Sequence, residues 1–273
     1  MARRLYNLAE WWHLLSLDAP TVAALWSWFF ARAMHLYIPL FAPLLLALGT
    51  WLLYVADRIL DGLRQGELLR ERHHFHARHR TAFLSAASLL AVLLAWSVVT
   101  RMRPEAVRDN SGIGVFALIY LFAVHRMPAL TLPKELAVAI LFAAATAVPA
   151  WSRLGAGNEL GKEQLAPAVV FFAGLCWINC VSIEKWEAGI NPATRWSSQH
   201  LRLFVTMIAL FSLAAALLAP SRGLMTVYLA GFLSSGLLFV LDARSSHLSP
   251  LHLRIAADAA LLTPLAFLPF AGD

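Results

Sequence analysis

The chain has 273 residues, of which 60% are hydrophobic and only 14% are charged, and its mean hydropathy is +0.65. Because a soluble domain usually carries about 25% charged residues, this composition excludes an ordinary soluble protein and indicates a polytopic membrane protein. The formal net charge of +6 does not indicate nucleic-acid binding, since the basic residues lie in short loops between apolar runs.

Nine apolar stretches are predicted to cross the membrane, because a spanning helix needs about 20 mainly apolar residues. In chain order they cover residues 15–32, 36–57, 82–100, 112–125, 133–151, 166–186, 202–219, 223–241 and 255–270. The first is interrupted by Asp18 and Pro20, and the fourth is short. We therefore expect one all-α transmembrane domain over residues 1–273, a bundle of about nine helices without a cleavable signal peptide.

The distribution of Lys and Arg sets the expected orientation of this bundle. With the N-terminus in the cytoplasm, the inner segments hold twice as many Lys and Arg residues as the outer segments. We therefore predict a multi-pass protein of a bacterial-type inner membrane, with the C-terminal end of the second stretch on the cytoplasmic side.

Two acidic residues, Asp57 and Asp61, close the second stretch. A carboxylate at the centre of a membrane helix costs about 2.5–3.5 kcal/mol, and two carboxylates four residues apart share one helical face and repel each other. A bound divalent cation would offset this cost. The alternative is that both lie at the headgroup level, pair with Arg58 or the loop arginines, and only anchor the helix end.

The loop that follows, from Arg64 to Arg80, is rich in arginine and histidine, which suggests that the cation arrives with a phosphate group. Its four histidines are His73, His74, His76 and His79. Capture of a diphosphate by the arginines is one interpretation, and a zinc site built from the histidines is a second. A third is contact with anionic lipid, worth about 1 kcal/mol per basic residue.

The sixth stretch ends with Asn179, Glu184 and Glu187, so that a second acidic pair follows on the same predicted membrane side. Two carboxylate pairs at matching depth could hold Mg²⁺ against a diphosphate, because Mg²⁺ binds through a few carboxylates and substrate phosphates. Such ions would stabilise a diphosphate leaving group. The alternative is an interfacial charge cluster of Glu184 and Glu187 with Lys185.

The ninth stretch contains a further acid, Asp258, with Arg254 four residues earlier as its expected partner. An acid inside a membrane span is a functional candidate by default, although a structural ion pair that lines the cavity is the favoured interpretation here. The two cysteines, Cys176 and Cys180, lie in one apolar run at helical spacing and are expected to be packing residues.

The run from Tyr54 to Gly62, Tyr-Val-Ala-Asp-Arg-Ile-Leu-Asp-Gly, resembles the first aspartate-rich motif of the UbiA superfamily of membrane prenyltransferases. The segment from Tyr120 to Arg126, with Lys134 after it, resembles the basic segment that leads into the fifth helix of that family. The family has about nine transmembrane helices and carries its two acidic motifs on helices two and six. The order and spacing of the motifs in this chain are similar.

The resemblance implies an enzyme that transfers a polyprenyl group from its diphosphate to a lipid-soluble acceptor, such as an aromatic ring. Mg²⁺ would be held by Asp57 and Asp61, helped by Glu184 and Glu187. The remaining implied site residues are Arg58, Arg64, Arg126 and Lys134 for the diphosphate, with Asn179 and Asp258 as secondary candidates. Two other functions stay open: a non-catalytic protein that binds isoprenoids or lipids, and a transporter, since intramembrane acids also serve proton relays.

Overall fold

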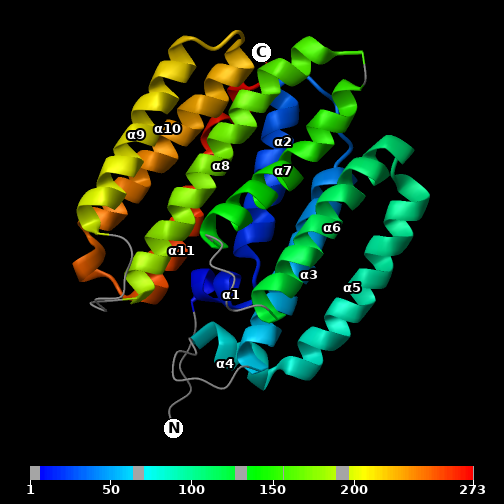
Figure 1. Cartoon of the computed structure of the whole chain (residues 1–273), viewed down its shortest axis with the longest axis vertical. Coiled ribbons are helices and arrows are strands. Elements are labelled where there is room, and N and C mark those ends of the chain that lie inside the picture. Colours follow the sequence, from blue (N-terminus) through cyan, green and yellow to red (C-terminus); the bar gives the residue numbers. More distant parts are fainter. Residues whose placement is uncertain (1–6, 64–70, 127–133, 156, 189–196, 273) are drawn as a thin grey trace.

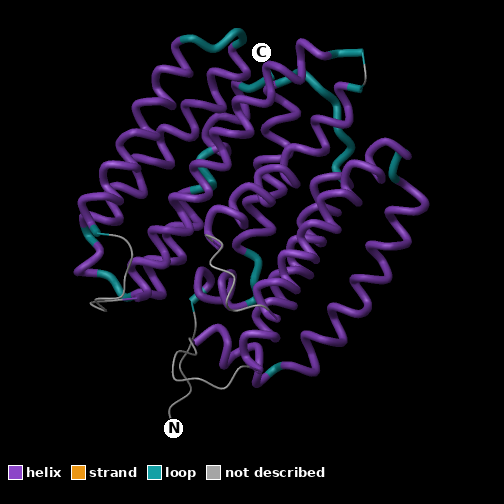
Figure 2. The backbone as a smooth tube through the Cα atoms, in the orientation of Figure 1, coloured by secondary structure: helices purple, strands orange, loops and turns teal. Residues whose placement is uncertain are grey.

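The computed structural model describes residues 7–63, 71–126, 134–155, 157–188 and 197–272. Within these ranges all regular structure is helical, and long helices alternate with short connections (Figures 1 and 2). The elements in chain order are α1 (Leu8–Leu14), α2 (Asp18–Ala33), α3 (Phe41–Leu63), α4 (Glu71–Arg78), α5 (Arg80–Arg101), α6 (Pro104–Arg126), α7 (Lys134–Leu154), α8 (Glu159–Ala188), α9 (Ser198–Leu217), α10 (Arg222–Ala243), η1 (Ser245–His247), α11 (Pro250–Ala260), α12 (Pro264–Phe267) and η2 (Leu268–Phe270).

Eight segments of the described chain are long and apolar enough to cross a membrane: α3, α5 to α10, and the stretch Pro250–Phe270. They correspond to the second to ninth predicted stretches, so the expected all-α architecture is confirmed, with eight candidate membrane spans in the described residues. A ninth span is obtained only if α1 and α2 are counted together, and these two helices meet at 89°.

The first predicted stretch, residues 15–32, begins three residues too early: the single helix it corresponds to is α2, which starts at Asp18 and has 16 residues. Ser16 lies between α1 and α2 with φ 60°, a left-handed conformation that turns the chain. Asp18 and Pro20 fall in the first turn of α2, where an acid interacts favourably with the helix dipole and a proline costs no hydrogen bond. These residues start a helix; the sequence prediction placed them inside one. As a result α1 lies across the end of the bundle nearest the N-terminus (Figure 1).

The buried centre of the bundle is α2, which contacts α3, α7, α10 and α11. Trp26 of α2 stacks on Phe172 of α8, with ring centroids 4.2 Å apart. Its indole Nε1 donates to the carbonyl of Leu261, at 2.8 Å. Leu261 follows the last residue of α11, so this bond satisfies a carbonyl that the helix leaves without an internal partner. The central helix thus fixes where α11 ends.

Two further helix pairs build one side of the bundle: α7 packs along α8, and α9 packs along α10 (Figure 1). Helices in lipid approach one another most closely at small residues. Gly223 in the first turn of α10 is such a position, since a Cβ atom there would lie 2.2 Å from the carbonyl oxygen of Ala33. The backbone of α10 therefore rests directly on the end of α2.

The other side of the bundle is packed more loosely. Helix α5 packs on α3 and α4, whereas α6 packs on α7. Phe83 is the one buried residue of α5, and apolar side chains such as Val99 and Phe116 are largely exposed, as expected for surfaces that face lipid. This arrangement leaves space between α3, α5, α6 and α7.

Gly223→Ala is expected to destabilise the protein by about 1–3 kcal/mol, because the added methyl group meets backbone atoms that cannot rotate away. The thermal unfolding midpoint in detergent, followed by circular dichroism, measures the effect. Gly236→Ala is the matched control on the same helix, since a Cβ at Gly236 meets no atom within 4 Å. Equal midpoints for the two variants would contradict the close approach of α10 to α2.

Candidate functional site

A cavity of about 920 Å³ lies between one face each of α3, α5, α6 and α7. Its lining on α3 runs from Phe41 to Asp61, about 30 Å along the helix axis. Most of the lining is apolar, and the charged residues gather at its two ends. The end beside α4 carries Asp57, Asp61, Arg72, Lys134, Glu135 and Arg254, and the opposite end carries Arg101, Arg103, Glu105 and Arg153.

Asp57 and Asp61 both line this cavity, as their i,i+4 spacing on α3 predicts. Asp61 lies 3.9 Å from the ring of His73 on α4, measured from Oδ2 to Nε2, and about a third of its side chain is exposed. The pair is therefore neither sealed in the core nor placed on the outer surface. It faces a largely apolar space from the C-terminal turns of a long helix.

Arg58, which the resemblance assigned to a diphosphate, is directed elsewhere. Its position next to Asp57 rotates it by about 100° around the helix, and its side chain is only 3% exposed. Its Nη1 donates to the carbonyl of His13 at 2.8 Å, and its Nη2 lies 3.4 Å from Asp18 Oδ2. Arg58 does not line the cavity, so these contacts correct its assignment from substrate binding to a buried structural ion pair.

The second acidic pair does not join the first. Neither Glu184 nor Glu187 lines the cavity. Glu187 instead accepts hydrogen bonds from Arg72 Nη1 at 2.8 Å and from Arg254 Nη1 at 3.2 Å. Both arginines line the cavity at the end where Asp57 and Asp61 lie. The position of Glu187 therefore favours a role in holding two cationic side chains over direct binding of a metal ion.

The other predicted diphosphate contacts divide between described and undescribed positions. Lys134 lines the cavity at the start of α7, and the Tyr120 hydroxyl of α6 donates to its carbonyl at 3.4 Å. Arg64 and the side chain of Arg126 lie outside the described part of the chain. Of the two expected diphosphate contacts whose side chains the structure describes, Arg58 and Lys134, Lys134 lines the cavity.

The histidines of the basic loop differ in burial: three lie on α4, and His79 lies between α4 and α5. His73 and His76 are buried, whereas His74 and His79 are exposed. His76 Nδ1 donates to the carbonyl of Arg72 at 2.9 Å, so its Nε2 accepts from the hydroxyl of Ser16 at 3.1 Å. In the described residues the one group of three potential metal ligands lies elsewhere.

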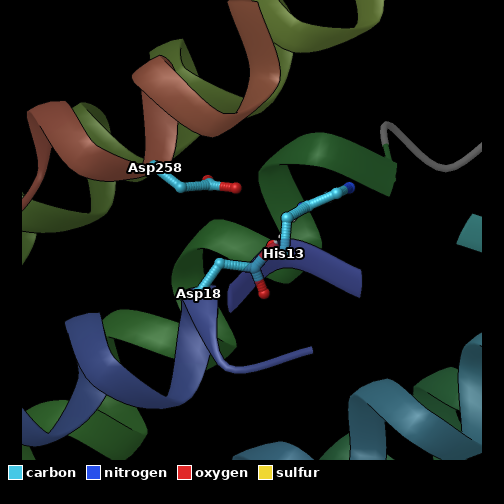
Figure 3. A group of neighbouring side chains, drawn as sticks. All are labelled: His13, Asp18 and Asp258. Atoms are coloured by element: carbon cyan, nitrogen blue, oxygen red, sulfur yellow. Dashed lines mark hydrogen bonds and ion pairs between the residues drawn. The ribbon is translucent and has the colours of Figure 1, made fainter. Parts of the chain in front are cut away.

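That group consists of His13 of α1, Asp18 of α2 and Asp258 of α11, whose ligand atoms all lie within 4.8 Å of one another (Figure 3). His13 Nδ1 lies 2.6 Å from Asp18 Oδ2, and these two side chains are 1% and 2% exposed. Asn179 Nδ2 of α8 donates to Asp258 Oδ1 at 3.2 Å. Four helices therefore bring one polar side chain each to one place, where His13, Asp18 and Asn179 are buried and Asp258 is half-buried.

The expected ion pair between Arg254 and Asp258 is not formed. Arg254 pairs with Glu187, and the hydrogen-bond partner of Asp258 is Asn179. Lys185, the expected partner of the glutamates in the alternative interpretation, has its Nζ 2.5 Å from Asp242 Oδ1. Asp242, at the end of α10, is buried and also accepts from Arg202 and Trp186, so it ties α8, α9 and α10 together.

Sequence reasoning missed His13, Asp18, Arg72 and Arg254 as parts of a shared charged region. Asp18 offered a usable signal, since an acid within an apolar stretch is a functional candidate, but it was interpreted only as an interruption. Arg72 belonged to the basic loop, and Arg254 was assigned to the nearest acid in sequence. No family model, no curated protein and no solved structure matches the chain.

Protonation of His76 is expected to make stability depend on pH. Burial lowers the pKa of His76 to about 4, and the charges of Arg58 and Arg72 act in the same direction against its backbone hydrogen bond. The unfolded chain, with a pKa near the ordinary 6.5, therefore binds the proton first. The contribution of His76 to the free energy of unfolding is therefore constant above pH 6.5. As the pH falls from 6.5 to 4, this contribution decreases by up to about 1.4 kcal/mol per pH unit.

The measurement is the unfolding free energy in detergent at several pH values, for the wild type and for His76→Gln. The variant cannot take up this proton, so its stability is expected to decline less steeply below pH 6.5. Identical slopes for the two proteins would show that His76 is not buried as a neutral ring.

Proposed function

We propose that this chain is an intramembrane prenyltransferase of the UbiA type, which acts on a polyprenyl diphosphate with the help of Mg²⁺. One observation carries the proposal: a single cavity joins a long apolar lining to an end that holds both a carboxylate pair, Asp57 and Asp61, and three cations. This arrangement matches an amphiphile, whose long hydrocarbon tail would lie against the apolar lining and whose strongly anionic head would lie at the charged end.

The three cations at the acidic end are Arg72, Lys134 and Arg254. Guanidinium groups bind phosphate oxygens through two parallel hydrogen bonds, and a lysine adds a point charge. In the proposed complex these side chains hold the diphosphate, while the tail extends along the apolar face of α3. Because Glu187 contacts both arginines, it would fix their direction before the substrate binds.

The carboxylates of Asp57 and Asp61 fit a Mg²⁺ ion, since both line the cavity and Mg²⁺ favours sites made of one or two carboxylates and substrate phosphates. Glu184 and Glu187 do not fit a second ion of this kind, because neither reaches the cavity. When bound, the ion would neutralise charge on the diphosphate as it leaves.

The reaction in this proposal begins when the allylic carbon–oxygen bond breaks and its electron pair leaves with the diphosphate. The acceptor then bonds to the allylic carbon and loses a proton. The apolar side chains of α3, α5, α6 and α7 would keep water away from the reactive carbon, so that the lipophilic acceptor is favoured over hydrolysis. We propose that this acidic end faces the cytoplasm in a bacterial-type inner membrane.

A second candidate is a non-catalytic protein that binds isoprenoid or lipid diphosphates in the same cavity. The contacts of Glu187 favour it, because the second acidic pair is held in ion pairs and away from the cavity. The two candidates share the ligand and differ in turnover, which one assay can separate.

Asp57→Asn and Asp61→Asn are each expected to lower Mg²⁺-dependent turnover of a radiolabelled prenyl diphosphate by about 10²–10³-fold, the usual cost of losing one group that stabilises developing charge. Turnover is measured on purified protein in detergent with a set of aromatic acceptors. Glu105→Gln is the matched control, since it removes an acid from the opposite end of the same cavity.

Wild-type turnover that persists in both aspartate variants would exclude the assigned site. Mg²⁺-dependent binding of the labelled diphosphate, without turnover for any acceptor in the set, would instead support the non-catalytic candidate.

Glu187→Gln separates the two roles of the second acidic pair. If Glu187 positions Arg72 and Arg254, the KM for the prenyl diphosphate is expected to rise about tenfold, the value of one charge-assisted contact near 1.5 kcal/mol. The concentration of Mg²⁺ that gives half-maximal rate should stay the same. A shift in the Mg²⁺ requirement without a change in KM would indicate that Glu187 is a metal ligand. Arg153→Gln, at the far end of the cavity, is the control for a general loss of positive charge.

A further inference from the structure

The cluster of His13, Asp18 and Asp258 is separate from the proposed substrate site. None of the three lines the cavity, and each comes from a different helix. Figure 3 shows Asp18 and Asp258, each on a different helix, with their carboxyl groups extended toward the region beside His13. Their ligand atoms lie within 4.8 Å of one another, so movements of an ångström or two would place all three around one ion.

A fourth potential ligand lies beside them. The Asn179 side chain is 5% exposed, and its amide nitrogen already contacts Asp258. Its carbonyl oxygen Oδ1 is fully buried and has no hydrogen-bond partner in the structure. A buried amide oxygen without a partner costs about 1–3 kcal/mol, so it is unusual unless a further group binds it.

Two arginines act electrostatically on both acids of the cluster, Arg58 and Arg254, but neither lies between the two carboxyl groups as an ion pair with Asp258. Asp18 and Asp258 carry two negative charges when ionised, and Arg58 contacts Asp18 alone. Within the described part of the chain Asp258 forms no ion pair, and its hydrogen bond comes from the neutral amide of Asn179. Two ionised carboxylates this close repel each other, and a divalent cation bound by both would remove that repulsion.

We propose that His13, Asp18 and Asp258, with the carbonyl oxygen of Asn179, bind one structural divalent ion of the zinc type. One imidazole with carboxylate and carbonyl oxygens suits Zn²⁺ and its neighbours among the transition metals, whereas Mg²⁺ prefers oxygen ligands and retained water. The site is thereby distinct from the carboxylate pair of the cavity, and it does not depend on the proposed enzymatic function.

The bound ion would connect four parts of the chain that no disulfide joins: α1, the start of α2, the middle of α8 and α11. Metal affinity of this kind is coupled to folding, because the ligands are brought together only in the folded chain. The ion would also hold Asp18 where Arg58 contacts it, and so support the end of α3 that carries Asp57 and Asp61.

The test is a titration of chelator-treated protein in detergent with Co²⁺ and then Zn²⁺, in the presence of excess Mg²⁺. We expect one ion per chain, visible d–d absorption of bound Co²⁺ that Zn²⁺ removes, and a raised thermal unfolding midpoint. His13→Gln and Asp258→Asn should each weaken Zn²⁺ binding at least about tenfold. The matched controls are His76→Gln, another buried histidine, and Asp57→Asn, an acid of the cavity; both should bind Zn²⁺ as the wild type does.

Asp258→Asn keeps the shape of the side chain and removes a buried charge, so it tests the proposal even if His13→Gln fails to fold. The proposal is overturned if the wild type binds no Co²⁺ or Zn²⁺ above the Mg²⁺ background, or if Asp258→Asn binds Zn²⁺ with unchanged affinity. Loss of Zn²⁺ binding in His76→Gln or Asp57→Asn, with normal binding in Asp258→Asn, would place the metal elsewhere and overturn it equally.

Discussion

The buried contact between Arg58 and Asp18 is the constraint on which the candidate site depends. Arg58 belongs to the same helical turn as Asp57, and from an adjacent face of α3 its side chain reaches Asp18 and the carbonyl of His13. Burying such a pair costs desolvation free energy that the attraction between the two charges offsets only in part. The pair therefore contributes mainly by specifying one arrangement of the helices. With Arg58 anchored in the α1–α2 corner, α3 has one rotational setting, and in that setting Asp57 and Asp61 face the cavity.

A second group of charges complements this setting from the other side of the cavity end. Arg72 comes from α4 and Arg254 from α11, and both contact Glu187 of α8. One carboxylate between two guanidinium groups leaves a net positive charge beside the acidic pair on α3. Opposite charges thus face a shared space from different helices, and an anionic ligand that carries a cation would satisfy both. This complementarity follows from tertiary placement, because the acids come from α3 and the two arginines from α4 and α11.

Local pattern predicted those features that depend on helix geometry alone. The apolar stretches gave eight of the long segments, and the spacing of Asp57 and Asp61 gave their common face. Helix geometry alone does not predict which charged side chains pair across the fold. The spacing predicts a pair of Arg254 with Asp258, four residues later, whereas Arg254 pairs with Glu187, 67 residues away. The corner at Ser16 lies at the start of the first predicted stretch, and the contact of the Ser16 hydroxyl there is with His76, 60 residues away, which local pattern does not predict.

The separate packing of α5 on α3 and of α6 on α7 has a consequence for how a ligand reaches the cavity. Both helices line the cavity, yet each is attached to a different neighbour, so the wall between them is a seam rather than a packed pair. A lipid that enters through this seam exchanges one hydrocarbon surrounding for another and never crosses bulk water. Its occupancy is then governed by its mole fraction in the bilayer, not by its aqueous concentration. For such a protein, dilution of the ligand with inert lipid is equivalent to a change in substrate concentration.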